Sequence, residues 1–334
     1  MIYKDTVYGD FEINDPIILD LINSAAIQRL KDIDVAGYRP AWIKPDLEIA
    51  EYGHSRYAHS IGVYLLLRKY DASLEEQIAG LIHDVSHSAF SHVIDYVLSA
   101  GSQKEQSHQD NSFEDYVKTK TDIPAILENY GLNLETILDD KNFPLKETKL
   151  PDICADRIDY SLRDATTFQE IDAAQVEYFL DNLVVKNKQW IFKNFESAKS
   201  FAELFRTMNN VYYSDLPSAI MFQVVADFLK YALQKNYISE ADLYTTDALV
   251  VDKIKGFLAE DAQLNLLWER MNNKTPITNN PADYDATVFC KSRMVDPLCL
   301  VDGEVKRVSD VEPSWGEIVK KESQPKQYFL KFSR

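Results

Sequence analysis

All six histidines of this 334-residue chain fall between positions 54 and 108. Clusters of histidine and carboxylate side chains serve two kinds of chemistry, metal coordination and proton transfer. A lone histidine is more often a packing or capping residue than a ligand. Six in one short segment need a chemical reason, so the sequence predicts a metal site or an acid–base site there.

The spacing inside this cluster is specific. Arg56-Tyr57-Ala58-His59 opens one expected helix, and His83-Asp84 closes the next. His87 follows His83 by four residues, and His92 precedes Asp95 by three. The last histidine, His108, stands in the polar stretch 101–111, which we expect to be an exposed loop.

A second constellation lies about 50 residues further along the chain. Asp156, Tyr160 and Asp164 follow one another at intervals of four, which places them on one stripe of an expected helix over residues 151–168. Alone, this stripe would be an ordinary solvated helix face. Its combination with an arginine-preceded histidine and a His-Asp pair is much less easily produced by chance.

The elements that must position these residues are mainly helices. A capping box at 73–76 predicts a helix over residues 74–83, and a long helix is expected over 197–235. Short hairpins are expected over 2–13 and 183–192, and strands dominate after the Asn- and Pro-rich linker 272–281. We divide the chain into a catalytic core over 1–195, a helical extension over 196–271 and a small β-containing region over 282–334.

Four stretches of the chain resemble the HD-domain superfamily of phosphohydrolases. The similarity is to the branch that contains the SAM-and-HD-domain deoxynucleotide triphosphohydrolase and its bacterial relatives, although no SAM domain is present. The resemblance implies a mainly α fold, in which a helical HD core carries short β-hairpins and a small α/β C-terminal appendage. The four stretches are Ile27-Gln28-Arg29-Leu30, Arg56-Tyr57-Ala58-His59-Ser60-Ile61-Gly62-Val63, His83-Asp84-Val85-Ser86-His87-Ser88-Ala89-Phe90-Ser91-His92 and Asp156-Arg157-Ile158-Asp159-Tyr160-Ser161-Leu162-Arg163-Asp164.

By this resemblance His59, His83, Asp84 and Asp156 match metal ligands. Two imidazoles and two carboxylates suit one divalent transition metal ion, Fe, Mn, Zn, Co or Ni, and leave two octahedral positions open. A purely structural metal is disfavoured, because closed structural sites are usually tetrahedral and rich in cysteine. A nucleotide substrate could bring an additional Mg ion.

The resemblance also implies acid–base residues. His87, His92 and His108 match the phosphate-contacting and acid–base histidines, and Asp95 matches the carboxylate that orients one of them. Cleavage of a phosphate ester develops charge on the equatorial oxygens, which a metal neutralises, and on the leaving oxygen, which a protonated histidine can protonate. We favour His92 with Asp95 as the proton donor and place His108 second.

Four further residues match substrate-binding positions: Arg56, Arg157, Tyr160 and Asp164. An arginine such as Arg56 can grip a phosphate with two hydrogen bonds. Tyr160 could stack on or hydrogen-bond a sugar, and packing within its own helix is an equal alternative. His54 is expected to be a supporting residue rather than a ligand.

The match weakens downstream. Relatives that cleave nucleoside triphosphates carry a basic cluster on a later helix, whereas here no Lys or Arg occurs between Arg206 and Lys230. A triphosphate carries about four negative charges and needs several cationic contacts. Gln109 also stands where such relatives have an acid, so this chain departs from the family pattern at a residue of the expected proton relay.

The leading hypothesis is therefore a metal-dependent phosphohydrolase that acts on a nucleotide or a related phosphate ester, with deoxynucleoside triphosphates suggested by the resemblance. An HD-type phosphodiesterase or nucleotide monophosphatase is the alternative enzyme. A nucleotide-sensing regulatory protein that keeps the pocket without the chemistry is the alternative outside enzymes.

Composition narrows the partners and the compartment. The formal charge of −17, from 36 basic and 53 acidic residues, disfavours binding to nucleic acid. The three cysteines lack metal-binding or disulfide spacing, which predicts reduced thiols and a cytoplasmic location. The chain has no uninterrupted run of about 18 apolar residues, so the sequence predicts no membrane span. The resemblance implies a homo-oligomer.

Overall fold

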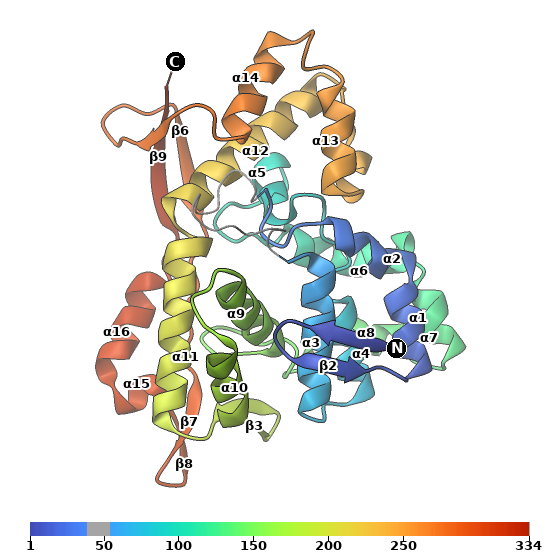
Figure 1. The fold of residues 1–334 in the computed structure, drawn as a ribbon, viewed down its shortest axis with the longest axis vertical. Coiled ribbons are helices and arrows are strands. Elements are labelled where there is room, and N and C mark those ends of the chain that lie inside the picture. Colours follow the sequence, from blue (N-terminus) through green and yellow to red (C-terminus); the bar gives the residue numbers. More distant parts are fainter. Residues whose placement is uncertain (39–53, 334) are drawn as a thin grey trace.

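The computed structural model describes residues 1–38 and 54–333, and in these residues it is mainly α-helical, as the sequence predicts. Figure 1 shows helices surrounding the central α9, with α11 and α12 following one another along the long axis of the molecule. The α-helices are α1 (Pro16–Asn23), α2 (Ala25–Arg29), α3 (Arg56–Lys69), α4 (Leu74–Ile82), α5 (Ile94–Val97), α6 (His108–Lys120), α7 (Ile123–Asn129), α8 (Leu134–Leu138), α9 (Ala155–Thr167), α10 (Ala173–Asn182), α11 (Phe195–Met208), α12 (Leu216–Gln234), α13 (Asp247–Lys255), α14 (Ala262–Met271), α15 (Val308–Val311) and α16 (Pro313–Glu322).

Three small sheets complete the described fold. The hairpin of β1 and β2 stands alone, β3, β4, β7 and β8 form the second sheet in that order, and β9 lies between β5 and β6 in the third. The strands are β1 (Ile2–Asp5), β2 (Gly9–Glu12), β3 (Leu183–Lys186), β4 (Gln189–Phe192), β5 (Ile277–Asn279), β6 (Ala286–Cys290), β7 (Leu298–Val301), β8 (Glu304–Arg307) and β9 (Lys326–Phe332).

The parallel pairing of β4 with β7 joins the β3–β4 hairpin to the C-terminal region. Ile191 lies opposite Leu298, and Phe192 opposite Cys299. One core cluster accordingly runs from Val7 to Trp315. The three-part division of the chain stays a prediction, but its first and third parts share this sheet and this core.

Helix α3 carries the first part of the site and is buried on two sides. Ile61 and Leu65 pack into the cluster formed with α1 and α4, while Val63 and Leu66 pack with α9. Gly62 lies where α9 crosses, and a Cβ there would lie 2.1 Å from side-chain atoms of α9. The glycine therefore allows α3 and α9 to approach closely enough to share a site.

Three expected boundaries differ from the structure. The helix expected from residue 151 begins at Ala155, and Pro151 lies in the preceding loop. The helix expected over 197–235 is broken by a π-helical turn at Asn209–Tyr213, after which Asp215 caps α12 by accepting the Ser218 N–H. The polar stretch 101–111 is not loop throughout, since α6 begins at His108.

Helix α12 is the described helix whose length and composition would allow it to cross a membrane, although it contains charged residues. It is 56% buried over its most apolar window. Its apolar residues, among them Val225 and Phe228, belong to a core cluster together with Phe90 and Leu264. This burial is the behaviour of a core helix.

Candidate active site

The four expected metal ligands converge from three helices. His59 lies in the first turns of α3, His83 caps the end of α4 and precedes Asp84, and Asp156 lies in the first turn of α9. The Nε2 atoms of His59 and His83 are 3.2 Å apart, and the Asp156 Oδ1 lies 2.9 Å and 3.6 Å from them. The Asp84 Oδ1 is 3.4 Å from the His83 Nε2.

The hydrogen bonds behind the two imidazoles fit a bound cation. The His83 Nδ1 lies 2.7 Å from the Gly80 carbonyl oxygen, which can only accept, and the His59 Nδ1 lies 2.7 Å from the Asp159 Oδ2. Both Nδ1 atoms thus donate, and the facing Nε2 atoms are left as lone pairs in the neutral rings. Two such lone pairs beside two carboxylates repel one another unless a cation lies among them, so the donor set suits a divalent metal.

The electrostatics of His59 agree with this fit. Burial disfavours its charged form, but the carboxylates of Asp156 and Asp159 overcome that effect and raise the pKa of His59 to about 10. A proton on the His59 Nε2 and a metal cation are alternatives at this position, and the raised pKa indicates that the carboxylates attract positive charge to the place where the ligand atoms meet.

Asp159 is a functional residue that the sequence pattern did not single out. It is fully buried, accepts from the His59 Nδ1, and accepts from the Arg163 Nε at 3.0 Å and Nη2 at 2.8 Å. Asp5 of β1 pairs with the same guanidinium at 3.1 Å. Two signals could have found it, the i+3 spacing from Asp156 and the glycine at position 62 that makes room for it.

Arg56 lines the cavity, but its guanidinium donates hydrogen bonds to other groups of the protein. Its Nη1 donates to the Asp84 Oδ2 at 2.8 Å, its Nε to the Ser91 Oγ at 2.9 Å, and its Nη2 to the Val35 carbonyl at 2.7 Å. Burial alone would raise the pKa of Asp84, yet Arg56 and the neighbouring histidines hold it well below its ordinary value. In this structure Arg56 orients the carboxylate of Asp84, an expected ligand, and its own contact with substrate stays a prediction.

His87 and His92 lie beside the metal ligands. The His87 Nε2 is 3.4 Å from the Asp84 Oδ1, and the rings of His87 and His92 meet edge to face at 5.2 Å. Burial lowers the pKa of His87 to about 4, with Arg56 adding to the effect, and burial lowers the pKa of His92 well below its ordinary value. Burial therefore favours the neutral form of both rings, and the role of His92 as proton donor stays a prediction.

Asp95 orients a histidine, but through the backbone. Its Oδ1 accepts the backbone N–H of His108 at 3.1 Å and that of Ser102 at 3.3 Å. This cap explains why α6 begins at His108. The His108 Nε2 lies 3.0 Å from the Tyr244 hydroxyl, so the histidine that Asp95 contacts is His108 rather than His92, and which of the two donates the proton stays a prediction.

The site opens into a cavity of about 1240 Å³. All the expected site residues except Asp95 and His108 line it, and so do Lys291 and Arg293, which the sequence pattern did not indicate. Arg157 donates to the Thr148 carbonyl at 2.6 Å and pairs with Glu147 at 3.0 Å. The expected site residues on the cavity wall are Arg56, His59, His83, Asp84, His87, His92, Asp156, Arg157, Tyr160 and Asp164; the wall also includes Gln109, which donates to the His83 carbonyl at 2.9 Å.

His108 does not line this cavity directly, although its neighbours Gln109 and Asp110 do. Asp164 lies on the wall and is 3.5 Å from the Nδ1 of buried His54, and the supporting role of His54 stays a prediction. Tyr160 packs edge to face on Tyr213 at 5.8 Å and also lines the cavity. Its two expected roles, packing and substrate contact, are thus both open to it.

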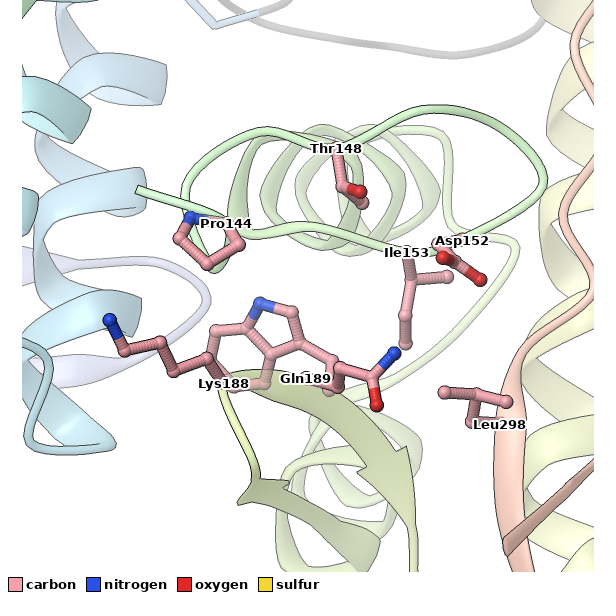
Figure 2. A pocket seen from close by; sticks show the side chains of 8 residues that line it. Pro144, Thr148, Asp152, Ile153, Lys188, Gln189 and Leu298 are labelled. Carbon is pink, nitrogen blue, oxygen red and sulfur yellow. The ribbon is translucent and has the colours of Figure 1, made fainter. Parts of the chain in front are cut away.

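A second, smaller cavity of about 120 Å³ lies behind the loop that precedes α9. Figure 2 shows Pro144, Thr148 and Ile153 of this loop above the β3–β4 turn with Lys188, and Leu298 to one side. Pro144 and Thr148 line both cavities. This loop therefore forms a wall of the active-site cavity.

Comparison with known proteins agrees with this site. The HD domain matches residues 56–164, which hold the four expected ligands. An uncharacterized protein of Bacillus subtilis, YdhJ, is 34% identical over 309 residues, which cover 92% of this chain and 91% of that protein. The chain belongs to the HD-domain family, and it is a metal-dependent phosphohydrolase.

Other relatives are similar over shorter stretches. The metal-dependent phosphohydrolase cns2 of Cordyceps militaris is 34% identical over 55% of this chain and 50% of its own length. The deoxynucleoside triphosphate triphosphohydrolase SAMHD1 homolog of Dictyostelium discoideum is 26% identical over 68% of this chain and 48% of its own length. A Bacteroides thetaiotaomicron phosphohydrolase structure shares the fold, with a TM-score of 0.72, 16% identity and full coverage of both chains.

Proposed function

We propose that this protein hydrolyses the 5′-phosphate ester of a nucleotide, with deoxynucleoside triphosphates as the substrate class to test first. The observation that carries the proposal is the cavity of about 1240 Å³ in which the metal ligands meet. Pockets for drug-sized ligands measure about 300–1,000 Å³, so this one has room for a whole nucleotide. The partial similarity to SAMHD1 proteins supports the choice of substrate.

The reaction would place the α-phosphate beside His59, His83, Asp84 and Asp156. A divalent metal held by these residues would supply charge neutralisation and water activation. Water adds to phosphorus, the bond from phosphorus to the 5′ oxygen breaks, and that oxygen takes a proton. The products are the nucleoside and inorganic triphosphate.

Different residues of the chain would have different roles in this reaction. Arg56 holds Asp84 in place, and Asp159 holds the His59 ring. Neutral His87 can accept a proton or a hydrogen bond beside the ligands. His108, positioned by Asp95 and Tyr244, is the donor we favour, provided that the first turn of α6 moves toward the bound substrate.

The test combines ligand substitutions with a substrate panel. His83→Ala and Asp156→Ala should each abolish metal content, measured by elemental analysis, and hydrolysis. Asp115→Ala, which removes an exposed carboxylate on α6, is the matched control and should change neither. Full metal and full activity in Asp156→Ala would show that the site assignment is wrong.

The panel separates the enzyme classes by product mass. Nucleoside tri- and monophosphates and cyclic dinucleotides are offered to the metal-loaded protein. Intact inorganic triphosphate supports the proposal, and orthophosphate indicates a phosphatase instead. Opening of a cyclic dinucleotide indicates a phosphodiesterase, and nucleotide-induced thermal stabilisation without turnover indicates a nucleotide sensor.

A further inference from the structure

We propose that Lys291 and Arg293 bind the phosphates that lie beyond the reacting one, and that the substrate is therefore a nucleoside polyphosphate rather than a monophosphate. The inference rests on the proposed function and specifies its substrate class. It also answers the charge problem left by the absence of Lys and Arg between Arg206 and Lys230. The cations that we propose, Lys291 and Arg293, come from the segment that follows β6.

The segment after β6 presents both side chains to the cavity. Lys291 and Arg293 are partly exposed and line the cavity wall, whereas Ser292 and Met294 are buried. Such alternation indicates that residues 291 and 293 face the same side of an extended segment. The buried positions anchor the segment, so the two cations share one fixed stretch of cavity wall.

The π-helical turn holds this segment in place. The Asn209 Nδ2 donates to the Ser292 Oγ at 2.9 Å, and the Asn209 Oδ1 accepts the Arg293 backbone N–H at 3.0 Å. Asn209 is itself buried. The stretch where relatives carry basic residues thus carries, in this chain, the amide that positions two basic residues from the C-terminal region.

Lys291 and Arg293 differ from Arg56, Arg157 and Lys146 because, in the part of the chain that the structure describes, they form no ion pair with a carboxylate. Arg56 is paired with Asp84, Arg157 with Glu147, and Lys146 with Asp140. Among the described residues, neither Lys291 nor Arg293 has a carboxylate within 4.0 Å. Two half-buried cations without ion pairs are costly to hold together unless an anion joins them.

The remaining lysines on the cavity wall, Lys141 and Lys149, are exposed to water. Contacts of exposed ammonium groups are worth little, because water and salt screen them. The half-buried pair is therefore the stronger anion site. Charge-assisted hydrogen bonds from such groups to phosphate oxygens are about twice as strong as neutral ones.

Both cations lie within electrostatic reach of the reaction centre. Each lowers the pKa of His92, after the larger effect of burial, and His92 packs on His87 beside the ligand Asp84. Arg293 also acts on Tyr160. A phosphate chain that starts at the metal ligands can therefore extend toward Lys291 and Arg293 within one cavity.

The acids around Lys291 do not cancel its charge. Burial lowers the pKa of Lys291 to about 8, Arg293 lowers it as well, and Asp110, Glu105 and Asp95 raise it. The depressing effects win, and the largest of them is burial, so the Lys291 ammonium group has lost hydration. The oxygens of an incoming polyanion would replace that hydration.

The experiment measures binding apart from turnover. Inorganic tripolyphosphate and inorganic orthophosphate are titrated into the metal-loaded protein by calorimetry, for the wild type and for Lys291→Gln combined with Arg293→Gln. Loss of two charge-assisted contacts should weaken tripolyphosphate binding by at least about tenfold. Orthophosphate, which binds at the metal ligands, should change by less than about threefold.

The matched control removes two charges elsewhere in the C-terminal region. Lys320→Gln with Lys321→Gln, on the exposed face of α16, should leave both affinities unchanged. Unchanged metal content and thermal unfolding in all variants show that the fold is retained. Equal weakening for both anions, or no weakening of tripolyphosphate binding, would overturn the assignment.

Turnover separates this inference from the proposed function. If the wild type binds tripolyphosphate through Lys291 and Arg293 but hydrolyses no nucleotide, the proposed function fails while the anion site stands. If the wild type hydrolyses triphosphates and the double variant keeps the same KM, the proposed function stands and the anion site fails. A KM at least about tenfold higher in the double variant supports both.

Discussion

The carboxylate of Asp159 should set the affinity of the metal site without touching the metal. It accepts the His59 Nδ1–H at 2.7 Å and holds the Arg163 guanidinium from its other side. In Asp159→Asn the single amide oxygen cannot serve both donors, and the amide NH2 turned toward His59 would favour the wrong tautomer. Loss of such a partner weakens metal binding by about 10- to 100-fold, which is about 1.4–2.7 kcal/mol.

Asp5→Asn is the matched control, because Asp5 pairs with the same Arg163 at 3.1 Å but does not contact His59. Both substitutions remove one of two buried carboxylates around a buried guanidinium. Each should lower the free energy of unfolding, by up to about 3–5 kcal/mol for a broken buried pair. Only Asp159→Asn should also lower the affinity for metal.

The assay is competition with a chelator of known affinity, read by elemental analysis, together with denaturant unfolding of the same samples. A metal Kd that rises in Asp159→Asn and changes by less than about threefold in Asp5→Asn supports the reasoning. Equal increases in both variants would mean that Arg163 and general stability, rather than the His59 tautomer, control the site. An unchanged Kd in Asp159→Asn would refute the role altogether.

Three further outcomes follow from the geometry. Gly62→Ala places a Cβ 2.1 Å from Asp159, so it should lower the free energy of unfolding by about 1–3 kcal/mol and reduce metal content; an unchanged denaturation midpoint would contradict this. Tyr244→Phe removes the hydroxyl bonded to His108 and should lower kcat by about tenfold, with KM nearly unchanged if the ring is the proton donor. Because the pKa of Lys291 lies at about 8, tripolyphosphate binding should weaken as pH rises through that value, and Lys291→Arg should show a smaller loss, since arginine keeps its charge; equal losses in calorimetry would exclude the lysine as the cause.

Sequence alone was sufficient for the family and for the set of metal ligands it implies. His59, His83, Asp84 and Asp156 carry short motifs on helices, and helix periodicity fixes which residues of one helix share a face. The same local rules gave the first two hairpins and the mainly helical fold. These features depend on neighbours within a few residues, which is why pattern and spacing suffice for them.

Boundaries were decided by partners distant in sequence. Helix α6 begins at His108 because Asp95 caps it, a side chain 13 residues away. The break between α11 and α12 is stabilised by Asn209 through contacts with the segment near residue 292. Neither the Asp95 cap nor the Asn209 contacts can be predicted from the local pattern of polar and apolar residues.

The chemistry of the individual histidines also required the tertiary structure. Burial and the nearby Arg56 lower the pKa values of His87 and His92, while the carboxylates of Asp156 and Asp159 raise the pKa of His59. A pKa depends on depth and on charges within a few ångströms, and these come from several helices at once. Sequence spacing gives the residue types but not this environment.

Lys291 and Arg293 show most clearly what the sequence determines and what only the tertiary structure decides. The sequence shows that no Lys or Arg occurs between Arg206 and Lys230, and this raised the question of which residues bind the phosphate charge. Only the tertiary structure could supply Lys291 and Arg293, because the segment that follows β6 reaches the cavity through a hydrogen bond to Asn209, more than 80 residues earlier in the chain. Local motifs were thus enough to predict the expected metal ligands. The positive charge that would select the substrate depends on long-range packing.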